Sequence, residues 1–199
     1  MNSIPLMEDF YSLQGEGFHA GRAAYFIRLA GCDVGCVWCD VKESWDKDAH
    51  PEVEVSEIID RVKASKTDFV VITGGEPAMY DLTELTQALK DIGTEIAIET
   101  SGAYKLVGNF DWICLSPKKF KMPLEENYSR AQELKMIIFN KHDFQWSEEL
   151  KAKVNKDCKL YMQPEWDKAD EMLPLMIDYV KKNVDWTISL QTHKFLGIE

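Results

Sequence analysis

The segment AGCDVGCVWCD, residues 30–40, indicates both the fold and the chemistry of this chain. Its cysteines, Cys32, Cys36 and Cys39, have CxxxCxxC spacing and follow directly after an apolar, β-branched run at 24–29. Because a strand that leads into a tight loop can bring three thiolates around one centre, the spacing predicts a compact metal site. On spacing alone, a zinc ion completed by a distant ligand and an iron–sulfur cluster with three protein ligands are equally good interpretations.

A [4Fe-4S] cluster usually takes four cysteines, so three would leave one iron with an open coordination position. The amino and carboxylate groups of S-adenosylmethionine (SAM) can chelate such an iron. Trp38, together with Gly31 and Gly35 at tight turns, favours a shielded cluster over zinc. Cys114 and Cys158 lie in or beside apolar runs, so we predict that they are core residues. Five cysteines, three of them crowded together, do not suit a disulfide framework.

Further along the chain, the run FVVI at 69–72 leads directly into Thr73 and the sequence GGEP at 74–77. Adjacent glycines let a backbone close on a ligand, and a carboxylate can accept from an ammonium group. Taken alone, such a run is most often an ordinary strand-to-helix turn. After CxxxCxxC, however, it resembles the GGEP motif of the radical SAM superfamily. The resemblance implies that Gly75 and Glu76 meet the SAM amino group.

Short apolar runs alternate with amphipathic stretches from residue 24 onward, which predicts parallel strands joined by crossover helices. Strands are expected near 24–29, 68–73, 95–99, 111–116, 133–139, 158–162 and 185–190, and helices near 56–65, 81–92, 147–155 and 168–183. Seven strands with four helices predict an α/β fold with an open, partial (βα) barrel, in one domain over 1–199. Functional residues are then expected at the carboxyl ends of the strands. The polar stretch 42–55 predicts a flexible surface loop.

The composition narrows the class of substrate. A formal net charge of −11 argues against a broad nucleic-acid-binding face and favours a small-molecule substrate. No apolar stretch approaches the roughly 20 residues that cross a bilayer, so no membrane partner is expected. The first residues, MNSIP, lack the basic leader and apolar core of a signal peptide, which predicts a cytoplasmic protein.

Five further segments make the resemblance more specific. They are FYSLQGEG at 10–17, FIRLAGC at 26–32, IETSG at 98–102, LSPK at 115–118 and QTHK at 191–194. Together they resemble the 7-carboxy-7-deazaguanine synthase family from about residue 5 to the last residue. The resemblance implies ring contraction of 6-carboxy-5,6,7,8-tetrahydropterin to 7-carboxy-7-deazaguanine with loss of ammonia, a step in the biosynthesis of 7-deazapurines such as queuosine.

The resemblance also implies a mechanism and partners. The cluster would donate an electron to SAM, and the resulting 5′-deoxyadenosyl radical would take a hydrogen atom from C6 of the pterin. The hydrogen would return after the ring rearranges, so SAM would be regenerated as a cofactor. An electron donor such as flavodoxin or ferredoxin and a homodimer are the implied partners.

Residue by residue, the resemblance assigns two sets of contacts. For SAM it implies Trp38, Cys39, Asp40, Gly75, Glu76, Ser116, Pro117, Lys118, Gln163, Pro164, Glu165 and Trp166. For the pterin it implies Leu13, Gln14, Gly15, Glu16, Arg28, Thr73, His193 and the terminal carboxylate of Glu199. Arg28 is the expected partner of the substrate carboxylate, because a flat polar heterocycle that bears a carboxylate needs a cation.

One position departs from the family pattern. Relatives have Thr or Ser after the Cys-Asp pair, and its hydroxyl binds a Mg²⁺ that bridges to the substrate. Here the residue is Val41, and an isopropyl group cannot coordinate a hard cation. Either the reaction depends less on Mg²⁺, or Asp40, Glu43 or Ser44 supplies the missing oxygen.

Two other functions are compatible with the cysteine motif. A radical SAM activase that makes a glycyl radical on a partner protein would also be short, but it has no reason to contain Gln14-Gly15-Glu16 or Arg28. A non-enzymatic zinc-binding module would need only the cysteines. Iron content and turnover of the carboxypterin discriminate the three.

Overall fold

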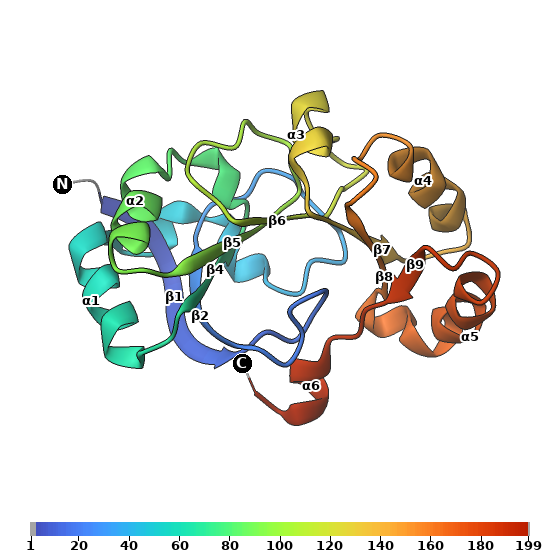
Figure 1. Cartoon of the computed structure of the whole chain (residues 1–199), viewed down its shortest axis with the longest axis horizontal. Coiled ribbons are helices and arrows are strands. Elements are labelled where there is room, and N and C mark those ends of the chain that lie inside the picture. Colours follow the sequence, from blue (N-terminus) through green and yellow to red (C-terminus); the bar gives the residue numbers. More distant parts are fainter. Residues whose placement is uncertain (1–2, 199) are drawn as a thin grey trace.

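The computed structural model describes residues 3–198, which form a single nine-stranded sheet surrounded by helices (Figure 1). The strands are β1 (Ser3–Leu13), β2 (Ala23–Leu29), β3 (Glu52–Glu54), β4 (Phe69–Gly74), β5 (Glu95–Thr100), β6 (Trp112–Leu115), β7 (Glu133–Ile138), β8 (Lys159–Pro164) and β9 (Trp186–Ile188). The α-helices are α1 (Val55–Ser65), α2 (Thr83–Asp91), α3 (Glu125–Arg130), α4 (His142–Lys151), α5 (Ala169–Val180) and α6 (Thr192–Leu196). Short 3-10 helices are η1 (Lys42–Trp45), η2 (Lys47–Ala49), η3 (Pro77–Met79) and η4 (Trp166–Lys168).

The strands follow the order β3-β1-β2-β4-β5-β6-β7-β8-β9. From β2 to β9 every neighbouring pair is parallel, whereas β1 is antiparallel to both β2 and β3. The prediction of parallel strands with crossover helices is therefore confirmed. Since β3 and β9 stand at opposite ends of the sheet in the described chain, the barrel is open, as predicted.

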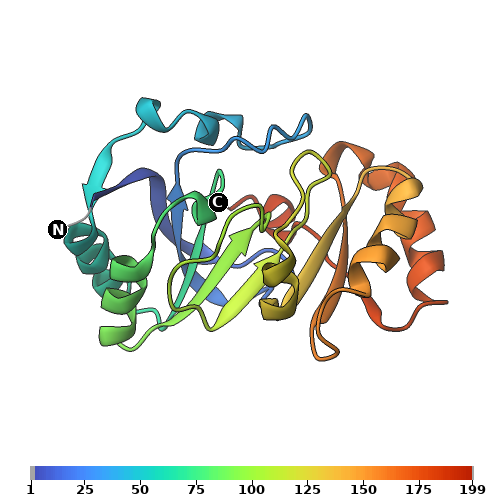
Figure 2. The same cartoon turned by 90° about the horizontal axis from the view of Figure 1, so that it is seen from above.

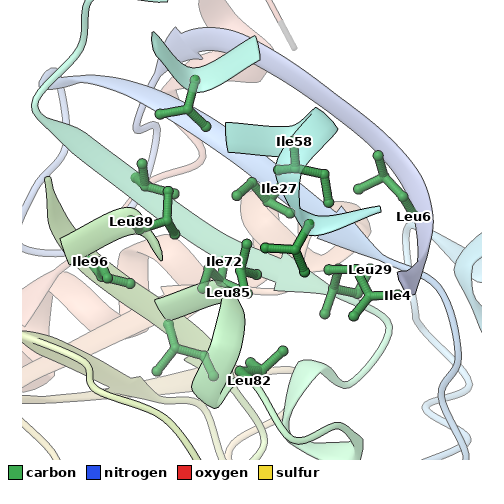
Figure 3. Packing of buried hydrophobic residues seen from close by; sticks show 14 of the residues in the cluster. Ile4, Leu6, Ile27, Leu29, Ile58, Ile72, Leu82, Leu85, Leu89 and Ile96 are labelled. Atoms are coloured by element: carbon green, nitrogen blue, oxygen red, sulfur yellow. The ribbon is translucent and has the colours of Figure 1, made fainter. Parts of the chain in front are cut away.

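The core is built from strands that are buried on both faces. Phe69, Val70, Val71 and Ile72 of β4 are each 0% exposed, which explains why this run is continuously apolar rather than alternating. On the outer face, Ile72 and its neighbours pack against α1 and α2 (Figure 3). On the inner face, Val71 packs within a smaller cluster and lines a cavity.

The predicted helices at 56–65, 81–92 and 168–183 are confirmed as α1, α2 and α5, with ends that differ by up to three residues. The prediction that a helix begins at Ser147 was wrong, because α4 begins at His142. Asp143 accepts from the backbone N–H groups of Phe139 and Asn140, each at 2.8 Å, and so stabilises the earlier start. Ser147 lies inside the helix, and its hydroxyl donates to the carbonyl of Asp143.

The prediction of a flexible loop at 42–55 was also wrong. This stretch contains η1, η2 and β3, and it supports the cysteine loop. The carbonyl of Ser44 accepts from the backbone N–H of Gly31 at 2.6 Å, and that of Trp45 accepts from Cys32 at 3.2 Å. In Figure 2 the segment between β2 and β3, drawn in blue, passes over one edge of the sheet. Of the helices in residues 3–198, none combines the length and the apolar character that crossing a bilayer requires.

Candidate functional site

A cavity of about 510 Å³ opens at the carboxyl ends of the parallel strands, where functional residues were expected. Nearly all predicted site residues line it. They are Leu13, Gln14, Gly15, Glu16, Arg28, Cys32, Cys36, Trp38, Cys39, Asp40, Thr73, Gly75, Glu76, Ser116, Lys118, Gln163, Pro164, Glu165, Trp166 and His193. Pro117 is not among the lining residues, and Glu199 lies outside the described part of the chain. One cavity thus brings together residues from both predicted ligand sets.

The three cysteines of the motif share the cavity wall and influence one another electrostatically. Burial raises the pKa of Cys32, and nearby Glu76 and Cys39 raise it further. Burial raises the pKa of Cys36 to about 11, against the effect of Lys118, with smaller contributions from Cys39 and Cys32. Among residues 3–198, no group of three or more His, Cys, Asp or Glu side chains is arranged to hold a single metal ion. Three soft sulfur donors on the wall of one cavity are the donor set that a cluster with one free iron requires.

The glycine turn after β4 packs directly on the cysteine loop. The backbone N–H of Gly75 donates to the carbonyl of Leu29 at 2.9 Å, and that of Glu76 donates to the carbonyl of Gly31 at 2.8 Å. A Cβ atom on Gly75 would lie 2.4 Å from the Gly31 oxygen and 2.8 Å from the Cβ of Cys32. Only glycine therefore allows this approach.

The carboxylate of Glu76 is 1% exposed and bonded within the protein. One oxygen accepts from the backbone N–H of Ala78 at 3.0 Å and from the Thr100 hydroxyl at 2.5 Å. The other accepts from the backbone N–H and the hydroxyl of Ser101. The three bonds from Thr100 and Ser101 join the glycine turn to the end of β5. A contact between the Glu76 acid and SAM stays a prediction.

The predicted SAM residues contribute a second wall. The ammonium group of Lys118 donates to the backbone carbonyl and the hydroxyl of Ser116, and it lies 5.5 Å from the centre of the Trp38 ring. Burial lowers the pKa of Lys118, while Cys36 opposes that shift. Glu165 has a buried carboxylate oxygen, Oε2, with no hydrogen-bond partner in residues 3–198. Such an oxygen needs a donor, which a hydroxyl-bearing ligand would supply.

Arg28 occupies the end of β2, in register with Thr73 of β4. Its Nε donates to Glu8 at 2.7 Å, and its two terminal nitrogens have no partner in the described chain. A guanidinium group held through Nε presents its remaining fork to an anion. The geometry therefore suits the predicted role of Arg28 as a carboxylate partner, without testing it.

A buried charged network forms a further part of the wall. The ammonium group of Lys135 lies 2.5 Å from a carboxylate oxygen of Glu16 and 2.5 Å from one of Glu99. Gln14 donates to Glu99 at 2.8 Å, and Gln191 donates to Glu16 at 3.0 Å. Neither Glu99 nor Lys135 was predicted as a site residue. Their signals were present, because Glu99 stands in the segment IETSG and Lys135 interrupts the apolar run of β7.

Helix α6 brings residues of the C-terminal motif, among them His193 and Lys194, to the wall of the cavity. The backbone N–H and the hydroxyl of Thr192 both donate to the carbonyl of Gly15 at 2.9 Å. A Cβ atom on Gly15 would lie 2.2 Å from Nδ1 of His193, so glycine is required for this contact. Burial lowers the pKa of His193, and Glu16 opposes the shift.

Val41, which stands where the family pattern has Thr or Ser, also lines the cavity. Val41 accepts, through its carbonyl, from the hydroxyl of Ser44 at 2.6 Å, and Ser44 is 1% exposed. The carboxylate of Asp40 accepts from Lys194 at 3.2 Å and from Gln191 at 3.4 Å. Glu43 is exposed and is not a lining residue. Of the side chains considered as replacement ligands, Ser44 and Glu43 do not line the cavity, whereas Asp40 does, with both of these bonds on Oδ2.

Comparison with known proteins agrees with this geometry. Residues 26–121 match the model of the radical SAM superfamily. A 7-carboxy-7-deazaguanine synthase of Flavobacterium psychrophilum is 56% identical over 98% of this chain and 92% of its own length. The corresponding synthase of Synechocystis is 48% identical over 98% of this chain and 94% of its own.

The fold is likewise similar to a solved structure, described as the crystal structure of QueE from Escherichia coli. The TM-score is 0.85 at 31% identity, over 94% of this chain and 93% of that one. The α/β partial barrel predicted from the sequence is thereby confirmed. Because likeness in sequence and fold extends over almost the full length of both partners, this chain belongs to the 7-carboxy-7-deazaguanine synthase family of the radical SAM superfamily.

Proposed function

We propose that this chain converts 6-carboxy-5,6,7,8-tetrahydropterin to 7-carboxy-7-deazaguanine with release of ammonia, in queuosine-type biosynthesis. The single observation that carries the proposal is the shared cavity. It joins the three cysteines to the free fork of Arg28 and to two carboxylates, in a chain that is 56% identical to a protein named 7-carboxy-7-deazaguanine synthase. A radical generated at the cysteines would then form beside the substrate rather than in solvent.

Cys32, Cys36 and Cys39 would hold the [4Fe-4S] cluster. The second wall of the cavity, which includes Trp38, Lys118 and Glu165, would hold SAM. Together, cluster and SAM supply a carbon-centred radical that abstracts hydrogen. The chain's own task is to bind SAM with its reactive carbon toward the pterin. The unpaired oxygen of Glu165 supports a hydrogen bond to a ligand hydroxyl in this wall.

At the other wall, Arg28 would bind the pterin carboxylate, and Thr73 lies beside it on the next strand. Gln14 and Glu16, which follow β1, and Glu99 of β5 would take the polar edges of the heterocycle. Helix α6 would limit access of water, because its His193 lies against Gly15 and both residues line the cavity. Exclusion of water protects a reactive radical from side reactions.

Val41 offers no side-chain oxygen to a Mg²⁺ ion, so the protein would hold this ion with fewer ligands here than in relatives with Thr or Ser. No hydroxyl is available at this position, and the hydroxyl of Ser44 donates to the Val41 carbonyl. Of the Asp40 carboxylate, Oδ2 is paired with Lys194. We therefore derive no step through Mg²⁺, and we propose that turnover depends less on this ion than in relatives with Thr or Ser at this position.

Three further features are part of the proposal. The cluster requires an outside electron donor, such as flavodoxin or ferredoxin. Since the described chain forms one continuous sheet, we expect residues 1–199 to form one domain. A cytoplasmic location is part of the same proposal. Because β3 and β9 leave the barrel open, we expect a homodimer that covers exposed edges or apolar flanks. Light scattering at micromolar concentration tests the dimer, and a monomer would remove it without affecting the chemistry.

The test of the function is anaerobic turnover by the reconstituted protein with SAM, reductant and the carboxypterin. We expect 7-carboxy-7-deazaguanine and ammonia in equal amounts, identified by mass spectrometry and an ammonia assay. SAM cleavage with no carboxypterin product would favour the activase alternative. Protein isolated with zinc, and unable to take up iron, would favour the zinc-binding module.

A further inference from the structure

Lys135 is almost completely buried although it carries a charge. Its side chain is 3% exposed and lies on β7, in a strand of otherwise mostly apolar residues. Its Nζ contacts one carboxylate oxygen of Glu16 and one of Glu99, both at 2.5 Å. Burial of an ammonium group is costly even when the group is paired. A packed apolar residue would serve stability as well, so the lysine points to a role in the site.

The two carboxylates are held in the same way. Glu16 places one oxygen on Lys135 and the other on the amide of Gln191 at 3.0 Å. Glu99 places one oxygen on Lys135 and the other on the amide of Gln14 at 2.8 Å. A carboxylate has about four lone-pair positions, so each retains capacity to accept from a ligand. All five side chains line the cavity.

Lys135 also fixes the charge of this cluster. Burial works against ionisation of Glu16, but Lys135 outweighs it and lowers the pKa of Glu16 to about 2. One lysine and two glutamates leave this part of the wall with a net negative charge. Without the lysine, two carboxylates would be buried side by side, and one would take up a proton. That oxygen would then donate instead of accept.

We propose that Lys135 is a positioning residue for substrate recognition, which holds Glu16 and Glu99 as paired acceptors for the N–H edge of the pterin pyrimidine ring. The inference rests on the proposed function. The N3–H and 2-amino groups of that ring are adjacent donors, and they match fixed carboxylate oxygens. The substrate carboxylate is repelled from this wall and directed to Arg28. An analogue with an oxo group in place of the 2-amino group presents an acceptor and is disfavoured.

The test compares binding of two stable ligands, 6-carboxypterin and its 2-oxo analogue, to the reconstituted, SAM-loaded enzyme by anaerobic calorimetry. We expect wild type to bind 6-carboxypterin at least about tenfold more tightly than the analogue. In Lys135→Met the ratio should fall to within about twofold, while SAM affinity is retained. Lys135→Arg keeps the charge and should keep most of the preference. Lys90→Met is the matched control, because Lys90 pairs with Asp111 away from the cavity and should leave the ratio unchanged.

A full preference in Lys135→Met with normal SAM binding would overturn the positioning role. If that variant does not fold, Glu99→Gln decides, since it leaves Lys135 in place and removes one of the paired charges. Loss of preference in Glu99→Gln supports the inference, and an unchanged ratio contradicts it. Failure of the wild type to bind or convert any carboxypterin would instead contradict the proposed function.

Discussion

Gly75 lies directly against Gly31, so that the turn after β4 and the start of the cysteine loop form one packed unit. The carbonyl oxygen of Gly31 accepts from the backbone N–H of Glu76 at 2.8 Å. It stands 2.4 Å from the position that a Cβ on residue 75 would occupy. The two sequence motifs are therefore not independent, because one sets the position of the other.

Gly75→Ala should displace the cysteine loop, because its methyl group meets backbone atoms that cannot swing aside. We expect iron content to fall well below that of wild type and SAM cleavage to drop at least about tenfold. Gly93→Ala is the control, since its Cβ meets nothing within 4 Å and strains only the local backbone. Iron analysis and circular dichroism measure both variants. Equal iron loading in Gly75→Ala and wild type would refute this packing argument.

The cysteines should divide into two classes. Reconstituted wild type should hold about four irons, and Cys32→Ala should lose both the cluster and SAM cleavage. Cys114 is 3% exposed on β6 and is absent from the cavity wall, so Cys114→Ala should retain both. If Cys114 proved as necessary as Cys32, the assignment of three ligands would be wrong.

Arg28→Ala should weaken binding of the pterin by about 2–5 kcal/mol, because a desolvated carboxylate loses its cationic partner. SAM affinity should not change. Arg22→Ala provides the comparison, since Arg22 pairs with Asp68 and Glu95 outside the cavity. Calorimetry with each ligand measures the effect. A parallel loss of SAM affinity in Arg28→Ala would indicate a folding defect instead of a recognition defect.

A magnesium titration tests the departure at Val41. Turnover by wild type should respond weakly to Mg²⁺, or only at high concentration, whereas Val41→Thr supplies a hydroxyl ligand and should respond at lower concentration. The readout is initial rate against free Mg²⁺. Superimposable curves with strong activation at the same low concentration would show that the hydroxyl is irrelevant in this protein.

Stability should decrease as the pH falls from about 7 to 5.5. Burial lowers the pKa of both His19 and His193 below the usual 6.5, so the unfolded chain binds protons that the folded chain does not. The contribution of these two histidines to the free energy of unfolding is fully present above their pKa in the unfolded chain. It is lost as the pH falls through their lower pKa in the folded protein. The raised pKa of buried Glu133 acts in the opposite direction.

The variant His19→Phe isolates the contribution of His19 to the pH dependence of stability. The Nε2 of His19 is buried without a partner in residues 3–198, among Phe69 and Trp112. Phenylalanine should therefore be tolerated and should reduce the loss of stability between the two pH values. Urea unfolding at pH 7 and 5.5 measures the difference. An identical pH dependence in variant and wild type would exclude this histidine as a source.

Local patterns explain which parts of the fold could be predicted. The fully buried run of β4 and the loop that follows β2 are continuous in sequence, so their apolar character and motif spacing are visible directly. β1 was not predicted, because it is partly exposed and its registers with β2 and β3 depend on distant residues.

The site shows the same limit. The motif residues could be identified, but the contact of Lys135 with Glu16 joins positions 119 residues apart. No periodicity reveals such a pair, and a single lysine in an apolar strand indicates only that a partner must exist. The sequence likewise does not reveal that the Glu76 carboxylate accepts from Thr100 and Ser101, or that the Ser44 hydroxyl donates to the Val41 carbonyl.

The central claim is that one cavity holds SAM and the pterin in direct contact, and deuterium transfer tests it most directly. Substrate deuterated at C6 would be turned over anaerobically with limiting SAM, and the recovered SAM and product would be examined by mass spectrometry. We expect 7-carboxy-7-deazaguanine as product and deuterium in the recovered SAM, with neither in Cys32→Ala. Product formed without any deuterium in SAM, or equal conversion by Cys32→Ala, would contradict the account.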